Sequence, residues 1–75
     1  MSATNDPLGK TIRRLRLEKE LSQEEFAHRA GLHRTYISQL ERGLKSPTLD
    51  VFYKVSRVLS MRPSQLMIEI EKEID

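Results

Sequence analysis

LSQEEFAHRAGLHRTYISQLERG, residues 21–43, contains the signals from which the overall architecture can be predicted. Ser22 is a good helix N-cap, and Glu25 three residues later completes a capping box, so we expect a helix to begin there. Gly31 follows the last residue of the helical period, where a residue without a Cβ turns the chain in a left-handed conformation without strain. A second helix is predicted over Thr35–Arg42, and the glycine after it is a stop signal. The stretch therefore predicts two short helices joined by a tight turn.

The small and aliphatic residues of these two helices have the spacing that a helix-turn-helix requires. Ala27 allows the helices to cross closely, and Ile37 and Leu40 hold the second helix against the first. Phe26 and Ala30 complete the inward face of the first helix. The spacing indicates a helix-turn-helix, although helix pairs with this spacing also occur in bundles that bind no DNA.

The outward side chains of the second helix are hydrogen-bond donors, acceptors and cations. An α-helix fits into the major groove of DNA, where such groups read the edges of the bases. This face is therefore a candidate DNA-reading surface, and the alternative is a solvated polar face on an ordinary helical hairpin. The side chains concerned are those of Arg34, Thr35, Tyr36, Ser38, Gln39 and Arg42.

Length and composition limit the classes of protein that the chain can belong to. Its 75 residues predict a single domain, and the helical patterns make this domain all-α. A domain of this size buries only about 60% of its unfolded surface and would gain stability from a dimer interface. The chain has no cysteine, so it contains no disulfide and no thiolate site. It also has no apolar run of the roughly 18 residues that span a membrane, and no apolar signal core near its start. We expect a soluble cytoplasmic protein.

The charge is distributed unevenly along the chain. Residues 1–46 carry nine Lys and Arg against six Asp and Glu, whereas residues 47–75 carry four against five. The basic half contains the predicted helix-turn-helix, which favours a surface that faces phosphates. On charge alone, an ordinary mixed surface remains the alternative.

Helical patterns also flank the central stretch. Residues 1–5 are expected to form a flexible N-terminus, and Asp6 followed by Pro7 predicts the start of a first helix. After a predicted loop over residues 44–47, Thr48 is a good N-cap for a helix that runs through Leu59. The inward stripe of that helix is predicted to consist of Leu49, Phe52, Ser56 and Leu59. Pro63 starts a last helix, in which Leu66, Met67, Ile70 and Ile74 share one face and Ile68 lies outside it.

Several apolar positions remain that so small a domain cannot readily bury. They include a second stripe of valines on the fourth helix and apolar residues of the last helix, residues 63–75, which is therefore the expected dimerisation element. A homodimer is favoured, and a larger monomer core is the alternative. The residues predicted for the interface are Val51, Val55, Val58, Met67, Ile68 and Ile74.

The sequence resembles a known family over roughly Leu8 to Met67. The runs L-S-Q-E-E-F-A, A-G-L, Y-I-S-Q-L-E-R-G and S-P-T-L are similar to those of Cro/C1-type (Xre) helix-turn-helix proteins, which include phage repressors. The run H-R-T-Y-I-S and the small size are similar to controller proteins of restriction–modification systems. The resemblance implies a compact five-helix lambda-repressor-like domain with the helix-turn-helix formed by helices 2 and 3.

The resemblance also implies roles for particular residues. Arg16 is expected to pair with Glu41 and to tie the first helix to the recognition helix, a structural role rather than a DNA contact. Gln23, in the first turn of helix 2, is expected to contact a phosphate, with helix capping as the alternative.

We assign the remaining polar residues to base reading or to phosphate contact. Arg34 is the strongest candidate for bidentate reading of guanine, and the other base readers are Thr35, Ser38 and Gln39. Gln39 reads adenine or only braces Gln23, and Tyr36 donates its hydroxyl to a phosphate or packs on the core. His33 is a helix cap or a phosphate donor. The full set assigned to phosphate is Gln23, His33, Tyr36, Arg42, Lys45 and Ser46.

Other chemistries find little support in the sequence. His28 and His33 are five residues apart without a third ligand type nearby, so no metal site is predicted. No catalytic constellation is present, and we expect neither an enzyme nor a cofactor, nor a small-molecule ligand. In activators of the family, an acidic patch on helix 2 faces RNA polymerase, and Glu24 is the residue here that the resemblance nominates for that contact.

The predicted function is therefore a homodimeric, sequence-specific regulator of transcription that binds a pseudo-palindromic site on double-stranded DNA. A phage-type repressor or an antitoxin-like autoregulator is the nearest alternative. A protein-interaction module whose helix-turn-helix no longer binds DNA is the alternative from a different class.

Overall fold

The computed structural model describes residues 6–74, and within this range the chain forms helices and no strand. The expected flexible N-terminus, residues 1–5, lies outside the described residues. The helices are α1 (Pro7–Glu18), α2 (Gln23–Ala30), α3 (Arg34–Glu41), α4 (Leu49–Val58) and α5 (Pro63–Glu73). The prediction of an all-α fold with five helices is confirmed, and α2 and α3 are the two helices of the helix-turn-helix.

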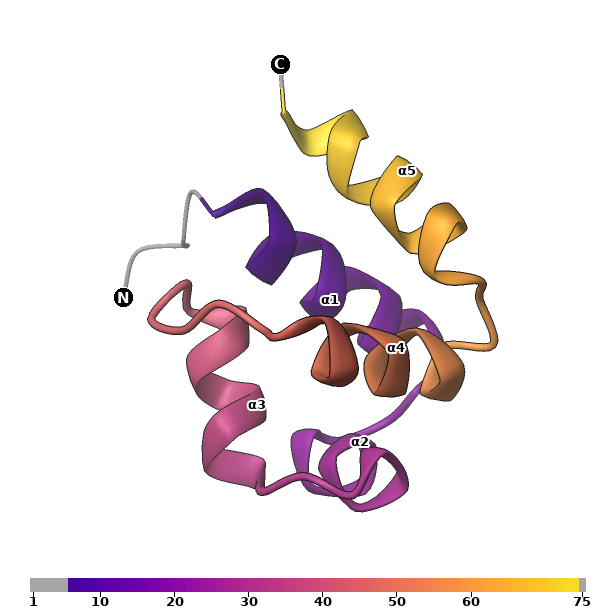
Figure 1. Ribbon diagram of the computed structural model, residues 1–75. Helices are drawn as coiled ribbons and strands as arrows, with labels where there is room; N and C mark the ends of the chain where they lie inside the picture. Colours follow the sequence, from indigo (N-terminus) through magenta and orange to yellow (C-terminus); the bar gives the residue numbers. More distant parts are fainter. Residues whose placement is uncertain (1–5, 75) are drawn as a thin grey trace.

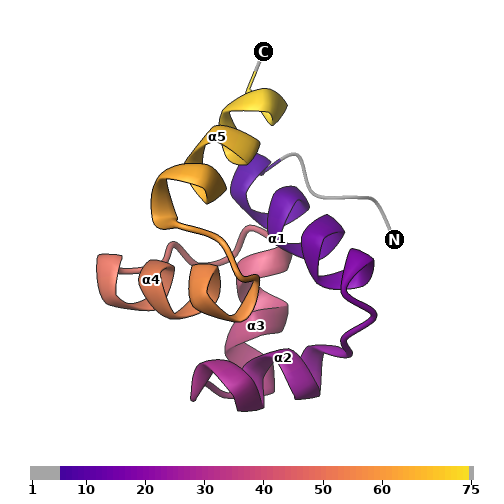
Figure 2. The ribbon, with the colours of Figure 1, turned by 90° about the vertical axis from the view of Figure 1, so that its right-hand side faces the viewer.

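The helices are arranged around α1 and a single core (Figure 1). In both views α5 lies alongside α1, while α2 and α3 cross at the opposite side of the molecule and α4 packs between α2 and α5 (Figure 2). Each helix contributes to the core, whose most deeply buried side chains are Ile12, Phe26, Ile37, Leu40, Val55 and Leu66. The arrangement leaves one side of α3 free of other helices.

Helices α1, α2 and α4 begin where the sequence predicts, because a side chain caps each of them. Asp6, Ser22 and Thr48 each accept a hydrogen bond from the backbone N–H three residues later. Ser22 and Glu25 form the predicted capping box, with both bonds at 3.0 Å. The N–H of Ser22, followed by its hydroxyl, lowers the pKa of the Glu25 carboxyl by hydrogen bonding. These local bonds fix the start of α2 independently of the core.

Helices α1 to α4 all end with the same backbone motif. A residue in the left-handed conformation follows each helix, and the next N–H donates to a carbonyl five residues back. Glycine occupies that position after α2 and α3, as predicted, with φ of 70° at Gly31 and 75° at Gly43. Glu20 and Ser60 occupy it after α1 and α4, with φ of 58° and 59°.

Two predictions for α4 are wrong. Val55, expected at a dimer interface, is only 1% exposed, because it lies one turn from Phe52 and from Leu59 on the inward side of the helix. Leu49, expected inside, is 71% exposed. It is the first residue of α4, and helical side chains point toward the N-terminus, so Leu49 projects past the end of the packed region. Val51 and Val58 are half-buried and pack against the core.

On α5 the predicted face is divided. Leu66 and Ile70 are buried, whereas Met67, Ile68 and Ile74 are exposed at 45%, 51% and 60%. The prediction that Leu66, Met67, Ile70 and Ile74 share one face is wrong, because only Leu66 and Ile70 lie in the core. Met67, Ile68 and Ile74, which are predicted for a dimer interface, are exposed in the monomer.

Ion pairs hold the other side of α5 against α1. Arg14 donates to Glu69 at 2.9 Å and to Glu18 at 3.2 Å, and the Lys10 ammonium lies 3.7 Å from the Glu73 carboxylate. Hydrogen bonds from Lys72 and then from Arg14 lower the pKa of the Glu69 carboxyl. One side of α5 is thus covered by α1, and the side that bears Met67 and Ile74 is uncovered.

Gly9 provides a test of how α1 meets the end of α3. A Cβ atom at this position would lie 2.6 Å from the carbonyl oxygen of Glu41 and 2.7 Å from that of Leu40. In a helix, alanine normally stabilises relative to glycine, by roughly 0.5–1 kcal/mol. Here we expect Gly9→Ala to lower the free energy of unfolding by about 1–3 kcal/mol in urea denaturation, because α1 and α3 must separate. A stability equal to that of the wild type, or higher, would contradict the close approach.

Candidate functional site

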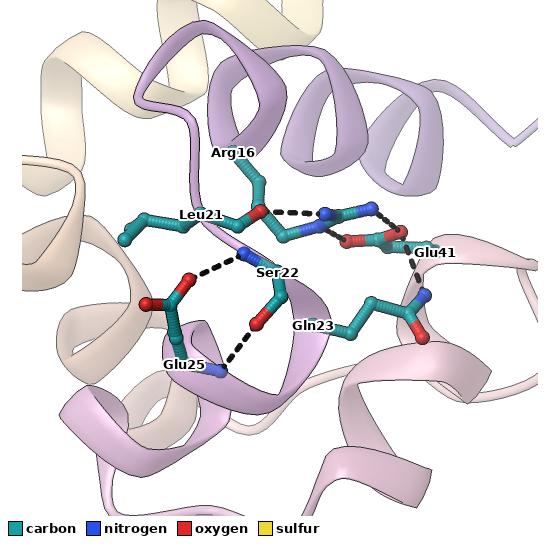
Figure 3. Close-up of polar contacts among 6 residues, drawn as sticks. All are labelled: Arg16, Leu21, Ser22, Gln23, Glu25 and Glu41. Carbon is teal, nitrogen blue, oxygen red and sulfur yellow. Dashed lines mark hydrogen bonds and ion pairs between the residues drawn. The ribbon is translucent and has the colours of Figure 1, made fainter.

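An ion pair between α1 and the last residue of α3 lies at the centre of the site (Figure 3). Arg16 Nε donates to Glu41 Oε2 at 2.6 Å, and Arg16 Nη2 donates to Glu41 Oε1 at 3.0 Å. The third guanidinium nitrogen donates to the carbonyl of Leu21 at 2.8 Å. The two side chains are only 7% and 2% exposed. The predicted pair is present, and its two parallel bonds fix the end of α3 against α1.

Gln23, the first residue of α2, contacts the same carboxylate. Its Nε2 donates to Glu41 Oε1 at 3.1 Å, so Glu41 accepts bonds from two other helices. The partner that the structure gives to the Gln23 amide is thus Glu41. Sequence reasoning did not find this contact, which joins residues 18 positions apart.

The outward face of α3 is polar and open to solvent. Ile37 and Leu40 are fully buried beneath it, so the helix cannot rotate without exposing them. On the opposite side, Arg34 and Thr35 are exposed, and Ser38 and Gln39 are half-buried. The residues predicted to read bases therefore lie together on one accessible face.

Three of the side chains assigned to phosphate lie in and after the last turn of α3. Arg42, Lys45 and Ser46 are all exposed. Leu44 lies between Arg42 and Lys45 in the sequence, and its side chain is 59% exposed. Sequence reasoning gave this residue no role. This segment places two cations beside the polar face of α3.

Two further residues at the start of α3 had open alternatives. His33 occupies the N-cap position by its backbone, but its side chain makes no capping hydrogen bond, so the side-chain cap is not formed. Tyr36 is half-buried, and it packs against the core as one of its two alternatives predicted.

Within residues 6–74, no group of three or more His, Asp or Glu side chains is placed to hold a metal ion. In the same part of the chain, every helix is too short or too polar to cross a lipid bilayer.

Comparison with known proteins identifies relatives over most of the chain. The model of a family described as Helix-turn-helix matches residues 12–66. The control protein C.BamHI of Bacillus amyloliquefaciens is 43% identical over 60 residues, which cover 79% of this chain and 74% of that protein. The control protein C.MunI of Mycoplasma is 42% identical over 66 residues, which cover 87% and 89% of the two chains.

A solved structure agrees with the sequence relatives. The restriction-modification controller protein C.AhdI from Aeromonas hydrophila superposes with a TM-score of 0.79 at 35% identity, over 83% of this chain and 94% of that chain. The relatives are control proteins and transcriptional regulators, not enzymes. The predicted resemblance to the controller proteins is therefore confirmed, together with the fold that it implied.

We expect the ion pair to depend on both partners. Arg16→Met leaves the Glu41 carboxylate buried without its partner, which should lower the free energy of unfolding by about 3–5 kcal/mol. Arg16→Met combined with Glu41→Leu removes both charges and should cost less than Arg16→Met alone. Arg14→Met, which breaks the partly exposed pairs with Glu69 and Glu18, is the control and should cost about 1 kcal/mol or less. Urea denaturation measures all three, and an equal cost for Arg16→Met and the control would refute a buried, structurally essential pair.

Proposed function

The chain belongs to the helix-turn-helix family, and from this premise we propose that it is a homodimeric, sequence-specific regulator of transcription of the restriction–modification controller type. The observation that carries the proposal is the polar, solvent-exposed face of α3. The C-terminal end of this helix is held in place by the ion pair between Arg16 and Glu41. A rigid helix with such a face enters the major groove without reorganisation of the protein.

Base reading is assigned to the first turns of α3. Arg34 presents an exposed guanidinium that fits guanine O6 and N7 with two parallel bonds. Thr35 offers a hydroxyl or a methyl contact to thymine, and Ser38 and Gln39 follow one turn later. Because these side chains differ in donor and acceptor pattern, each favours a different base edge.

Backbone contact is assigned to the margins of that face. Arg42 and Lys45 supply positive charge at the end of α3, and Ser46 supplies a hydroxyl in the same loop. Gln23, His33 and Tyr36 complete the set on the other side. Such contacts fix the register of the protein on the duplex and determine the salt dependence of the affinity.

We assign the dimer interface to the exposed apolar side chains of α4 and α5. Leu49 and Tyr53 are exposed on α4, Met67 and Ile68 are exposed on α5, and Ile74 is exposed directly after α5. Burial of these side chains against a second copy would remove a large apolar area from water. A dimer that reads both halves of a pseudo-palindromic site needs its two α3 helices about 34 Å apart.

The control proteins and controller protein among the relatives suggest the regulatory setting. We propose that this protein binds a promoter next to its own gene, and that it regulates the transcription of that gene and of a neighbouring restriction endonuclease gene. Glu24, exposed on α2, is assigned to contact with RNA polymerase when the bound site lies beside the polymerase.

DNA titration tests the reading role. Fluorescence anisotropy would compare the duplex upstream of the protein's own gene with a scrambled duplex at about 150 mM salt, where we expect a preference of at least about a thousandfold. Arg34→Ala should weaken operator binding by about 1–3 kcal/mol and scrambled binding far less. Arg57→Ala, at an exposed position of α4, is the matched control and should bind like the wild type. Equal binding of both duplexes by the wild type would refute operator reading.

Sedimentation equilibrium tests the dimer. The double variant Met67→Glu, Ile74→Glu places two carboxylates on the uncovered side of α5, and we expect it to be monomeric where the wild type is a dimer. Leu17→Glu, at a 48% exposed apolar residue near the end of α1, is the control and should remain dimeric. A dimer that survives the double variant, or a monomeric wild type, would place the interface elsewhere or remove it.

A further inference from the structure

The contact between Gln23 and Glu41 joins the free ends of the helix-turn-helix. The turn at Gly31–His33 connects the C-terminus of α2 to the N-terminus of α3. Gln23 begins α2 and Glu41 ends α3, so the 3.1 Å bond between their side chains connects the two remaining ends. The helix pair is therefore linked at both ends, by backbone at one and by a charge-assisted hydrogen bond at the other.

The geometry of the amide at Gln23 is determined by its partner. A carboxylate only accepts hydrogen bonds, so the nitrogen of the amide must face Glu41 and the oxygen must face away (Figure 3). Glu41 is itself held in place by two bonds from Arg16. Gln23 thus ties α2 to an anchor that is already attached to α1.

We propose that Gln23 is a positioning residue for base reading, which acts through Glu41 to set the angle of α3 relative to α2. The inference rests on the proposed DNA-reading function and adds to the phosphate contact assigned to Gln23, because the amide has a second N–H. Base-reading side chains must be held within about 0.5 Å of their productive positions. A change in the angle of α3 moves Arg34 and Gln39 relative to the base edges but leaves the backbone contacts largely available.

The two roles of Gln23 predict different effects of one substitution. Gln23→Met keeps the length of the side chain and removes its donor. If Gln23 only contacts a phosphate, operator and scrambled duplexes lose affinity by the same factor. If Gln23 also positions α3, both duplexes lose the phosphate contact by the same factor, and the preference for the operator over the scrambled duplex falls about tenfold in addition, as expected for one charge-assisted hydrogen bond.

A second measurement uses the protein without DNA. The Nε–H of Arg16, which donates to Glu41 at 2.6 Å, is observable by NMR, and its exchange with solvent reports on opening of the buried pair. We expect Gln23→Met to accelerate this exchange about tenfold at a temperature where circular dichroism shows the variant folded. Gln65→Met is the matched control, since it changes a glutamine in the first turn of α5 and should alter neither quantity.

The outcomes separate the alternatives. Faster exchange together with a reduced operator preference supports the proposal. An unchanged exchange rate, an unchanged preference, or an equal loss for both duplexes overturns it. A wild-type protein that does not distinguish the two duplexes shows instead that the proposed function is wrong, and the positioning role falls with it.

Discussion

The buried ion pair between Arg16 and Glu41 sets the position of α3 against α1. Two charges in a nearly dry site contribute little net stability, because the cost of removing them from water offsets much of their attraction. Their value is geometric: a bidentate pair has one good arrangement, and that arrangement fixes the end of α3 against α1. Gly9 makes the same junction possible from the α1 side, since any side chain there would meet the carbonyls of Leu40 and Glu41.

The two faces of the short helix α3 have different roles. Ile37 and Leu40 hold it in the core, and Glu41 fixes its end, so none of these residues is available to a partner. The polar residues on the other face contribute little to the core, so their side chains are available for contact with a partner. Because the helix is only eight residues long, its orientation comes from its neighbours rather than from its own helix propensity. A domain of this size cannot bury all of its apolar side chains, and some of those on α4 and α5 therefore stay uncovered.

Sequence reasoning succeeded where a structural feature is local. The capping box of Ser22 and Glu25 and the left-handed Gly31 depend on residues three or four positions apart, so they can be read from the chain. It failed where the outcome depends on how a helix is rotated against others: Val55 and Leu49 both fit a plausible stripe, and only packing decides which one is buried. The bond from Gln23 to Glu41 could not be predicted, because it requires the crossing angle of α2 and α3. The assigned DNA contacts follow from exposure and chemistry and remain predictions.

The ion pair between Arg16 and Glu41 implies that α3 is already oriented for the major groove before DNA binds. Residual dipolar couplings of the backbone N–H groups, measured for the free protein and for its complex with the operator duplex, test it most directly. We predict that α3 keeps the same orientation relative to α1 in the free protein and in the complex, as is usual for a preorganised interface. A rotation of α3 on binding, with loss of the Arg16–Glu41 contact, would contradict the account and would mean that DNA, rather than the buried ion pair, sets the reading geometry.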